Sequence, residues 1–203
     1  SVASSTLRHG RSEGEVFSQY TGGLEPEGSV AIEEFVRDGG TLIACDWSVA
    51  FAVDLFGLEL ESAVGRGDDR FRCPGSILRT VPTSDSPWTA GFPASQPIYF
   101  AKSRVYAPKA GAEDDDVGEE LLVYPKSGIL LSGWAKNAAK IAGAAAWRRV
   151  RIGDGQVHLF GFSPHYRSWT QTTFRALTRA ILLPAEATSA QIGTSAGGES
   201  DGN

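Results

Sequence analysis

Hydrophobic and polar positions along the chain follow two spacings, one typical of helices and one typical of buried strands. Apolar side chains recur every three to four positions near residues 27–38, 48–56 and 169–183, which predicts three amphipathic helices. Short apolar runs at 41–45 and 156–162 predict buried strands. Helices that alternate with buried strands favour a layered α/β domain.

The first predicted helix has a charged face and an apolar face, and Gly39-Gly40 ends it. Glu33 and Arg37 belong to the charged face. The side chains expected to face the core are Val30, Ala31, Ile32, Phe35 and Val36. This helix should therefore pack on the sheet through its apolar face.

The middle of the chain has a different pattern, in which short apolar runs are separated by Pro and Gly. Such runs predict a mixed β region. They lie at 71–81, 98–100, 105–106, 121–124 and 129–131. Two longer runs, 143–152 and 156–162, are joined by Gly153-Asp154-Gly155, which predicts a hairpin.

The number of predicted strands is small for a doubly wound parallel sheet. Before Thr41 the pattern predicts one helix and no strand. Either the sheet is mostly antiparallel, or the chain begins partway through a larger domain. We expect residues 1–184 to form one α/β domain that is incomplete at its N-terminal side, and residues 185–203, rich in Ala, Ser, Thr and Gly, to form a disordered tail.

The composition of the chain argues against nucleic acid and membrane as partners. The 203 residues are 41% apolar with a net charge of −5, which suffices for a core and disfavours nucleic acid. No apolar run approaches the length of about 20 residues that a membrane span needs. The chain has no Met, which suggests a piece of a longer protein. Cys45 and Cys73 are expected to be free thiols, although a disulfide between them stays open.

Several short motifs occur in a characteristic order. They lie at residues 20–24, 28, 35–42, 71–79, 130–134 and 155–167. Together they resemble the C-terminal glutamine-amidotransferase-like domain of bacterial zinc carboxypeptidases of the M14 family. The resemblance covers roughly residues 8–183 and implies a three-layer, flavodoxin-like sandwich. It also implies that a peptidase domain and the first strands of this domain lie upstream in the parent polypeptide, which would be secreted or periplasmic.

The resemblance does not place the peptidase's zinc site in this chain. That family binds zinc through a His-x-x-Glu pair and a distant His. The three histidines are His9, His158 and His165, and none is followed by Glu three residues later. We therefore expect no cofactor here, with zinc bound only in the parent's peptidase domain.

A Cys45/His165 pair is the sharpest enzymatic hypothesis. Cys45 follows a predicted strand and precedes a helix, and His165 follows a later strand, as in amidotransferases with a Cys nucleophile. Three features oppose it. The acid that would orient the histidine is absent, because Tyr166 and Arg167 follow His165. A nucleophile elbow needs small residues two positions either side of the nucleophile, where this chain has Ile43 and Trp47. Asp46 beside the thiol would raise the pKa of Cys45.

A binding role is the other hypothesis for the loop after residue 162. His165 and Arg167, with Tyr166, Trp169 and Trp134, could form an aromatic and cationic patch for a carboxylate or a sugar. Alternatively, the two tryptophans are core or interface residues and Arg167 pairs with a carboxylate.

Three functions follow from these patterns. The leading one is a non-catalytic accessory or assembly domain of an M14-like protein, which packs on the peptidase domain, on the remaining strands of its own domain or on a second copy. The alternatives are a thiol hydrolase or amidotransferase-like enzyme that uses Cys45 and His165, and a carbohydrate or small-ligand binding module.

Overall fold

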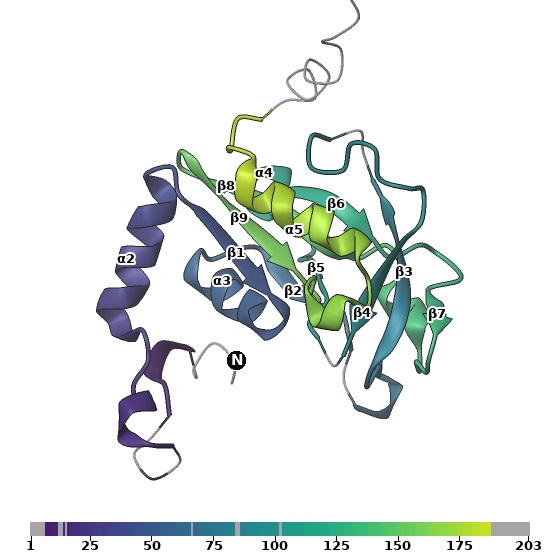
Figure 1. Ribbon diagram of the computed structural model, residues 1–203, viewed down its shortest axis with the longest axis horizontal. Helices are drawn as coiled ribbons and strands as arrows, with labels where there is room; N and C mark the ends of the chain where they lie inside the picture. Colours follow the sequence, from purple (N-terminus) through teal and green to yellow (C-terminus); the bar gives the residue numbers. More distant parts are fainter. Residues whose placement is uncertain are drawn as a thin grey trace, which may run out of the picture.

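A curled mixed sheet with helices on both faces forms the body of the protein (Figure 1). The computed structural model describes residues 7–11, 14, 16–65, 67–83, 86–101 and 103–187. The strands are β1 (Thr41–Cys45), β2 (Leu60–Ser62), β3 (Ser76–Pro82), β4 (Gln96–Phe100), β5 (Tyr106–Pro108), β6 (Glu119–Val123), β7 (Leu130–Ser132), β8 (Ala145–Ile152) and β9 (Gly155–Phe160). The helices are α2 (Glu25–Arg37), α3 (Val49–Leu55), α4 (Asp114–Val117) and α5 (Thr172–Leu182).

The main path of the sheet runs β1-β9-β8-β6-β3-β4, with β2, β5 and β7 paired off this path. Only β1 and β9 pair in parallel among these described strands, and the other pairs are antiparallel. The predicted α/β class is confirmed, and the sheet is mostly antiparallel. Because each antiparallel step reverses direction, β1, β9, β6 and β4 all point the same way, and their carboxyl ends share one edge of the sheet.

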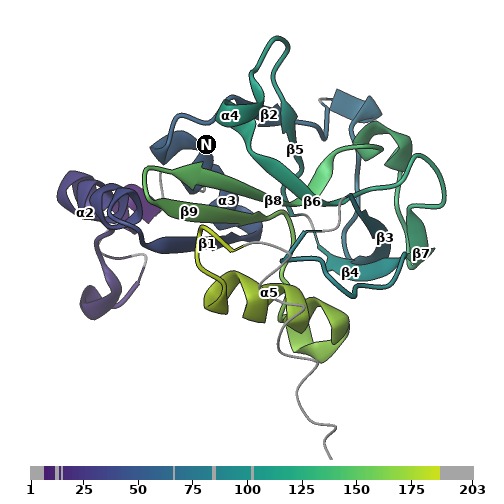
Figure 2. The ribbon, with the colours of Figure 1, turned by 90° about the horizontal axis from the view of Figure 1, so that it is seen from above.

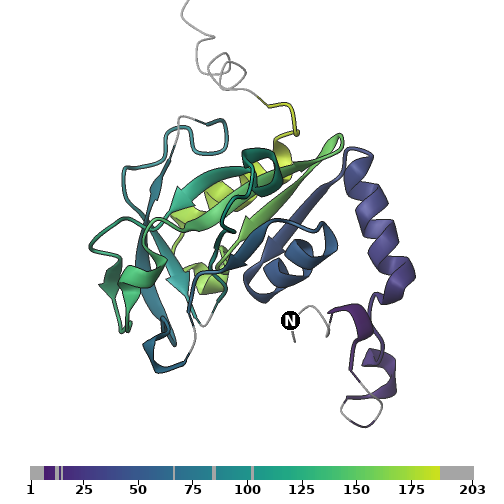
Figure 3. The ribbon, with the colours of Figure 1, turned by 180° about the vertical axis from the view of Figure 1, so that it is seen from behind.

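Strand β9 is buried on both faces, as its continuous apolar run predicted. Val157 and Leu159 pack in one core with residues of α3, whereas Phe160 packs in a second core with residues of α5. Figure 3 shows α3 in front of the sheet and α5 behind it. The predicted hairpin is also present, because β8 and β9 pair antiparallel from Trp147↔Phe160 to Ile152↔Gly155.

Helix α2 differs from its prediction. It forms close to the expected position, but of its predicted inner face only Val36 is fully buried. Val30 is 52% exposed and Phe35 is 58% exposed. Figure 2 shows α2 at the β1 end of the sheet, at the opposite end from β3 and β4. Apart from Val36, which packs in a core cluster with Val157 of β9, the apolar face of the helix is therefore largely left uncovered by the described part of this chain.

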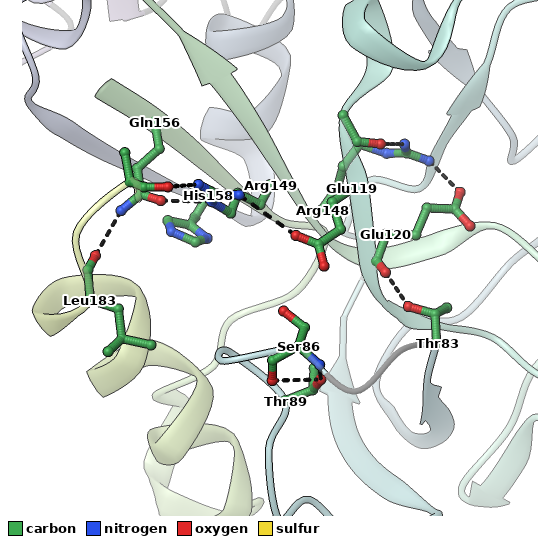
Figure 4. A network of polar contacts seen from close by, with 12 residues as sticks. Thr83, Ser86, Thr89, Glu119, Glu120, Arg148, Arg149, Gln156, His158 and Leu183 are labelled. Atoms are coloured by element: carbon green, nitrogen blue, oxygen red, sulfur yellow. Dashed lines mark hydrogen bonds and ion pairs between the residues drawn. The ribbon is translucent and has the colours of Figure 1, made fainter. Parts of the chain in front are cut away.

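A buried polar network fixes the end of α5 to the sheet (Figure 4). Gln156 of β9 donates to the Leu183 carbonyl at 2.8 Å and accepts from Arg149 Nε at 2.8 Å. Arg149 also donates to the Ala185 carbonyl, and its guanidinium lies 3.9 Å from the centroid of the Trp88 ring. These bonds satisfy an arginine that is only 8% exposed.

The predicted boundary at residue 184 falls inside this network. Residues 185–187 belong to the predicted tail, yet Ala185 is buried and held by Arg149. The remainder of the predicted tail, 188–203, lies outside the described residues. The described part of the domain therefore runs to residue 187.

Candidate functional site

The turn from β1 into α3 has the geometry of a tight strand-to-helix elbow. Asp46 has a φ of 55°, in the left-handed region that a residue with a side chain adopts only at a cost. The Ser48 hydroxyl fixes the turn, because it accepts from the Cys45 amide and donates to the Cys45 carbonyl, both at 2.8 Å. Asp46, and not Cys45, therefore occupies the strained position of the elbow.

The residues around Asp46 meet the steric rule that Cys45 fails. Two positions before Asp46 lies Ala44, and two positions after it lies Ser48, and both are small. The Ser163 hydroxyl lies just beyond β9 and donates to Asp46 Oδ2 at 3.1 Å. Asp46 Oδ1 is buried and has no hydrogen-bond partner among the described residues. The elbow thus holds a carboxylate between the carboxyl ends of the two parallel strands.

The Cys45 thiol is not in a setting that activates a nucleophile. Its side chain is partly buried and packs against the core beneath α5. Burial, followed by the negative charge of Asp46, raises the pKa of Cys45 to about 11. The thiol is therefore protonated at neutral pH, which weighs against nucleophilic catalysis. Cys45 and Cys73 are both free, as the sequence predicted.

The loop after β9 brings together several predicted site residues. Trp169 packs edge-on against Tyr99 and Tyr166, with ring centroids 5.0 Å and 5.6 Å away, and Tyr99 stacks on Tyr166 at 4.2 Å. The Arg167 guanidinium lies 5.4 Å from the Tyr166 ring centroid, and His165 is exposed beside them. Three aromatic rings, of which only Tyr99 was not anticipated for this patch, thus anchor the loop to β4.

Trp134, the remaining predicted site residue, lines a separate cavity with a volume of ≈ 480 Å³. Its backbone is held by Ser76, whose hydroxyl donates to the Trp134 carbonyl at 2.7 Å and accepts from the Trp134 amide at 2.8 Å. The residues that line this pocket are Trp47, Val64, Arg70, Phe71, Arg72, Cys73, Pro74, Phe100, Ser103, Arg104 and Trp134. Trp134 is therefore a pocket residue, whereas Trp169 belongs to the aromatic cluster on Tyr99.

Sequence reasoning missed most of this pocket and the role of Asp46. Trp47 and Arg104 lie far apart in the sequence, yet the Arg104 guanidinium is 4.1 Å from the Trp47 ring centroid. Nothing in the local pattern signals that pairing. The sequence did contain a sign of the role of Asp46, because small residues lie two positions before and two positions after Asp46, as a strand-to-helix elbow requires.

No group of three or more His, Cys, Asp or Glu side chains in the described part of the chain could hold a metal ion. Among the same residues, no helix is both long and apolar enough to cross a membrane. The described side chains therefore offer polar, aromatic and cationic groups for binding, and a single carboxylate at the elbow.

The fold defines an α/β protein with a mixed sheet and a pocket near the carboxyl ends of its parallel strands. No protein-family model and no curated protein matches the sequence. One similar solved structure is a β-galactosidase from Bacillus circulans sp. alkalophilus, with a TM-score of 0.48, 13% identity, and coverage of 83% of this chain and 21% of that chain. Another is the cytoplasmic protein STM3548 from Salmonella typhimurium, with a TM-score of 0.47, 18% identity, and coverage of 84% of this chain and 65% of that chain.

Both similarities are distant. This chain spans about a fifth of the β-galactosidase chain and 65% of the Salmonella protein. With identities below a fifth and TM-scores below 0.5, neither similarity assigns a function. Function must therefore be argued from the surface and the pocket of this chain.

Proposed function

We propose that this chain is a non-catalytic accessory or assembly domain, which packs through α2 and the free edge of β1 onto the remainder of its own polypeptide. The observation that carries the proposal is the uncovered apolar face of α2. Val30 and Phe35 project into solvent from this helix, in which only Val36 and Ser29 are buried. Burying an exposed Val or Phe contributes about 1.5–3 kcal/mol, so a partner that covers this face gains stability.

The position of β1 supports packing through the same surface. β1 ends the main path of the sheet, and its other side has no strand partner among the described strands. Leu42 and Ile43 are partly exposed there. Parallel strands normally lie inside a sheet that is covered on both faces, and an open strand edge offers unpaired backbone groups to another chain segment. An added strand beside β1 would occupy that edge and lie close to α2.

The sequence resemblance suggests what the partner is. In a glutamine-amidotransferase-like, flavodoxin-like domain of the M14-carboxypeptidase type, the first strands and the peptidase domain would precede this chain. Those first strands suit the open β1 edge, and a zinc site would lie in the peptidase domain. A secreted or periplasmic location belongs to the same proposal. Homodimerisation through the α2 face is the competing arrangement.

Hydrogen exchange on the isolated chain and on the full gene product tests the proposal. We expect the amides of β1 and α2 to exchange more slowly in the full product, because new contacts bury them. Exchange in α5, whose Ile181 is also exposed, is expected to stay the same and serves as the internal control. Equal exchange of β1 and α2 in the two proteins would show that this surface is not the packing surface.

A matched pair of variants separates the proposal from homodimerisation. Phe35→Glu puts a charge on the α2 face, and Ile181→Glu puts one on α5. If the isolated chain is a dimer that only Phe35→Glu dissociates in sedimentation experiments, the surface joins two copies. If the isolated chain is a monomer and only Phe35→Glu raises exchange in the full product, the partner lies within the same polypeptide.

A further inference from the structure

A pocket at the shared edge of the sheet has a lining that differs from the rest of the protein. Trp47 follows the end of β1, and Phe100 and Ser103 lie at and beyond the end of β4. The backbone of Arg104 packs so closely on Gly161, just after β9, that a side chain at that glycine would overlap the Arg104 carbonyl. The carboxyl ends of three strands that run in one direction therefore meet at this pocket, which is where open α/β sheets usually bind ligands.

The lining is cationic in an acidic protein. The chain has a net charge of −5, yet the described residues that line the pocket include Arg70, Arg72 and Arg104 and no acidic residue. Arg72 is partly neutralised at the rim by Asp68, at 3.2 Å. Arg104 has no ion-pair partner among the described residues, and its buried Nε has no hydrogen-bond partner there. The pocket thus concentrates positive charge that the protein itself does not neutralise.

Aromatic rings supply the apolar part of the lining. Phe71 and Phe100 are buried and pack edge-on with ring centroids 5.4 Å apart, which gives the pocket a rigid floor. Trp47 and Trp134 are about half exposed. The Arg104 guanidinium carbon lies 4.1 Å from the Trp47 ring centroid, a cation–π contact that holds the guanidinium at the pocket wall.

An orphaned hydroxyl points to a missing polar partner. Ser103 is 6% exposed and lines the pocket, and its Oγ has no hydrogen-bond partner among the described residues. A buried hydroxyl without a partner is costly, so native proteins normally satisfy it with a protein group, a water or a ligand. Ser103 and the neighbouring Arg104 together offer one hydroxyl and several N–H donors to the same ligand.

From this lining we infer that the pocket binds a small organic anion in which a carboxylate is attached to a ring, either a flat aromatic ring or a pyranose. The ring lies between the tryptophans, and Arg104 and Ser103 donate to the carboxylate. The volume of ≈ 480 Å³ is in the range of small-molecule sites. A guanidinium edge matches the two oxygens of a carboxylate, and indole faces favour rings. This site is independent of the packing surface proposed for α2 and β1.

Calorimetric titration with four probes tests the chemistry. Benzoate and glucuronate each combine a ring with a carboxylate, acetate lacks the ring, and benzyl alcohol lacks the charge. We expect benzoate or glucuronate to bind at least about tenfold more tightly than acetate and benzyl alcohol, and whichever binds more tightly identifies an aromatic acid or a sugar acid. Equal binding of all four probes, or no binding of either ring carboxylate at millimolar concentration, would overturn the inference.

Two arginine variants locate the binding. Arg104→Gln is expected to weaken binding of the better ring carboxylate about tenfold or more, since it removes the charged hydrogen bond. Arg175→Gln is the matched control, because Arg175 lies near Phe92, 5.9 Å from that ring centroid, and lines a different cavity. Equal loss in both variants would place binding elsewhere or show nonspecific charge attraction. The indole N–H signals of Trp47 and Trp134 in NMR spectra give a second measurement, and both should shift on binding.

Discussion

Acidification to pH 5 is expected to destabilise the fold through one buried side chain, His158. The imidazole lies on β9 with 0% exposure and accepts a hydrogen bond from Trp147 Nε1 at 3.2 Å through Nδ1. The Trp88 ring lies 6.1 Å away, centroid to centroid. Burial, followed by the positive charge of Arg149, lowers the pKa of His158 from 6.5 to about 3. The folded protein therefore holds this histidine neutral.

The sign and size of the effect follow from proton linkage. Between pH 6.5 and pH 3 the unfolded chain binds a proton at His158 that the folded chain does not bind, so stability falls as the pH falls. At 1.36 kcal/mol per pKa unit, the loss between pH 7.5 and pH 5 is about 2 kcal/mol. This value changes little if the folded-state pKa lies anywhere below about 4, because the unfolded state then sets the proton uptake.

Urea unfolding of the wild type and of His158→Gln at pH 7.5 and pH 5 measures this contribution. The variant is expected to be less stable at both pH values, but its loss on acidification should be smaller than that of the wild type by about 2 kcal/mol. The control is His165→Gln, which removes an exposed histidine and should keep the wild-type loss. If His158→Gln shows the same loss on acidification as the wild type, His158 is not held neutral and the reasoning fails.

Three further predictions concern the elbow and the packing of the sheet. In a Cys73→Ala background, Cys45 should react with iodoacetamide at pH 8 about 100-fold more slowly than an ordinary thiol, because the pKa of Cys45 is about 11. Fast alkylation of Cys45, or thiol-dependent hydrolase activity of the protein, would instead support the enzyme hypothesis. Asp46→Gly and Asp46→Ala both lose the Ser163 hydrogen bond, but only glycine adopts the positive φ of this position without strain. In urea unfolding, Asp46→Gly should therefore be more stable than Asp46→Ala by about 1 kcal/mol, and equal stability of the two variants would show that the elbow is unstrained. Gly155→Ala should destabilise the protein by about 1–3 kcal/mol in urea unfolding, because its Cβ would overlap the Val36 carbonyl, and a neutral result would mean that α2 moves freely away from β9.

Local patterns predicted several parts of the fold correctly. The run at residues 156–162 is mostly apolar, and β9 is buried on both faces. The Gly153-Asp154-Gly155 sequence predicted the β8–β9 hairpin, and 3.6-residue periodicity predicted α5. These features depend on residues close together in the sequence, so their physical causes are visible in it.

The candidate site was predicted only in part, for an equally physical reason. Periodicity identifies an apolar face but not what covers it, and Phe35 of α2 is exposed although its pattern predicts burial. The choice between Cys45 and Asp46 as the strained residue depends on one backbone angle, which the strand-to-helix turn decides.

By itself, the sequence determined most of the strands and helices, though not β2 or α4. It also determined that the class is α/β and that the carboxyl end of β9 is a place to look for a site. Only the tertiary structure decided which residues come together at that edge of the sheet. The order of the strands sends β1, β9 and β4 in one direction, and so brings Trp47, Arg104 and Trp134 to one pocket. Their sequence positions are separated by about 30 to 90 residues, and no local spacing encodes a contact that the pairing of distant strands creates.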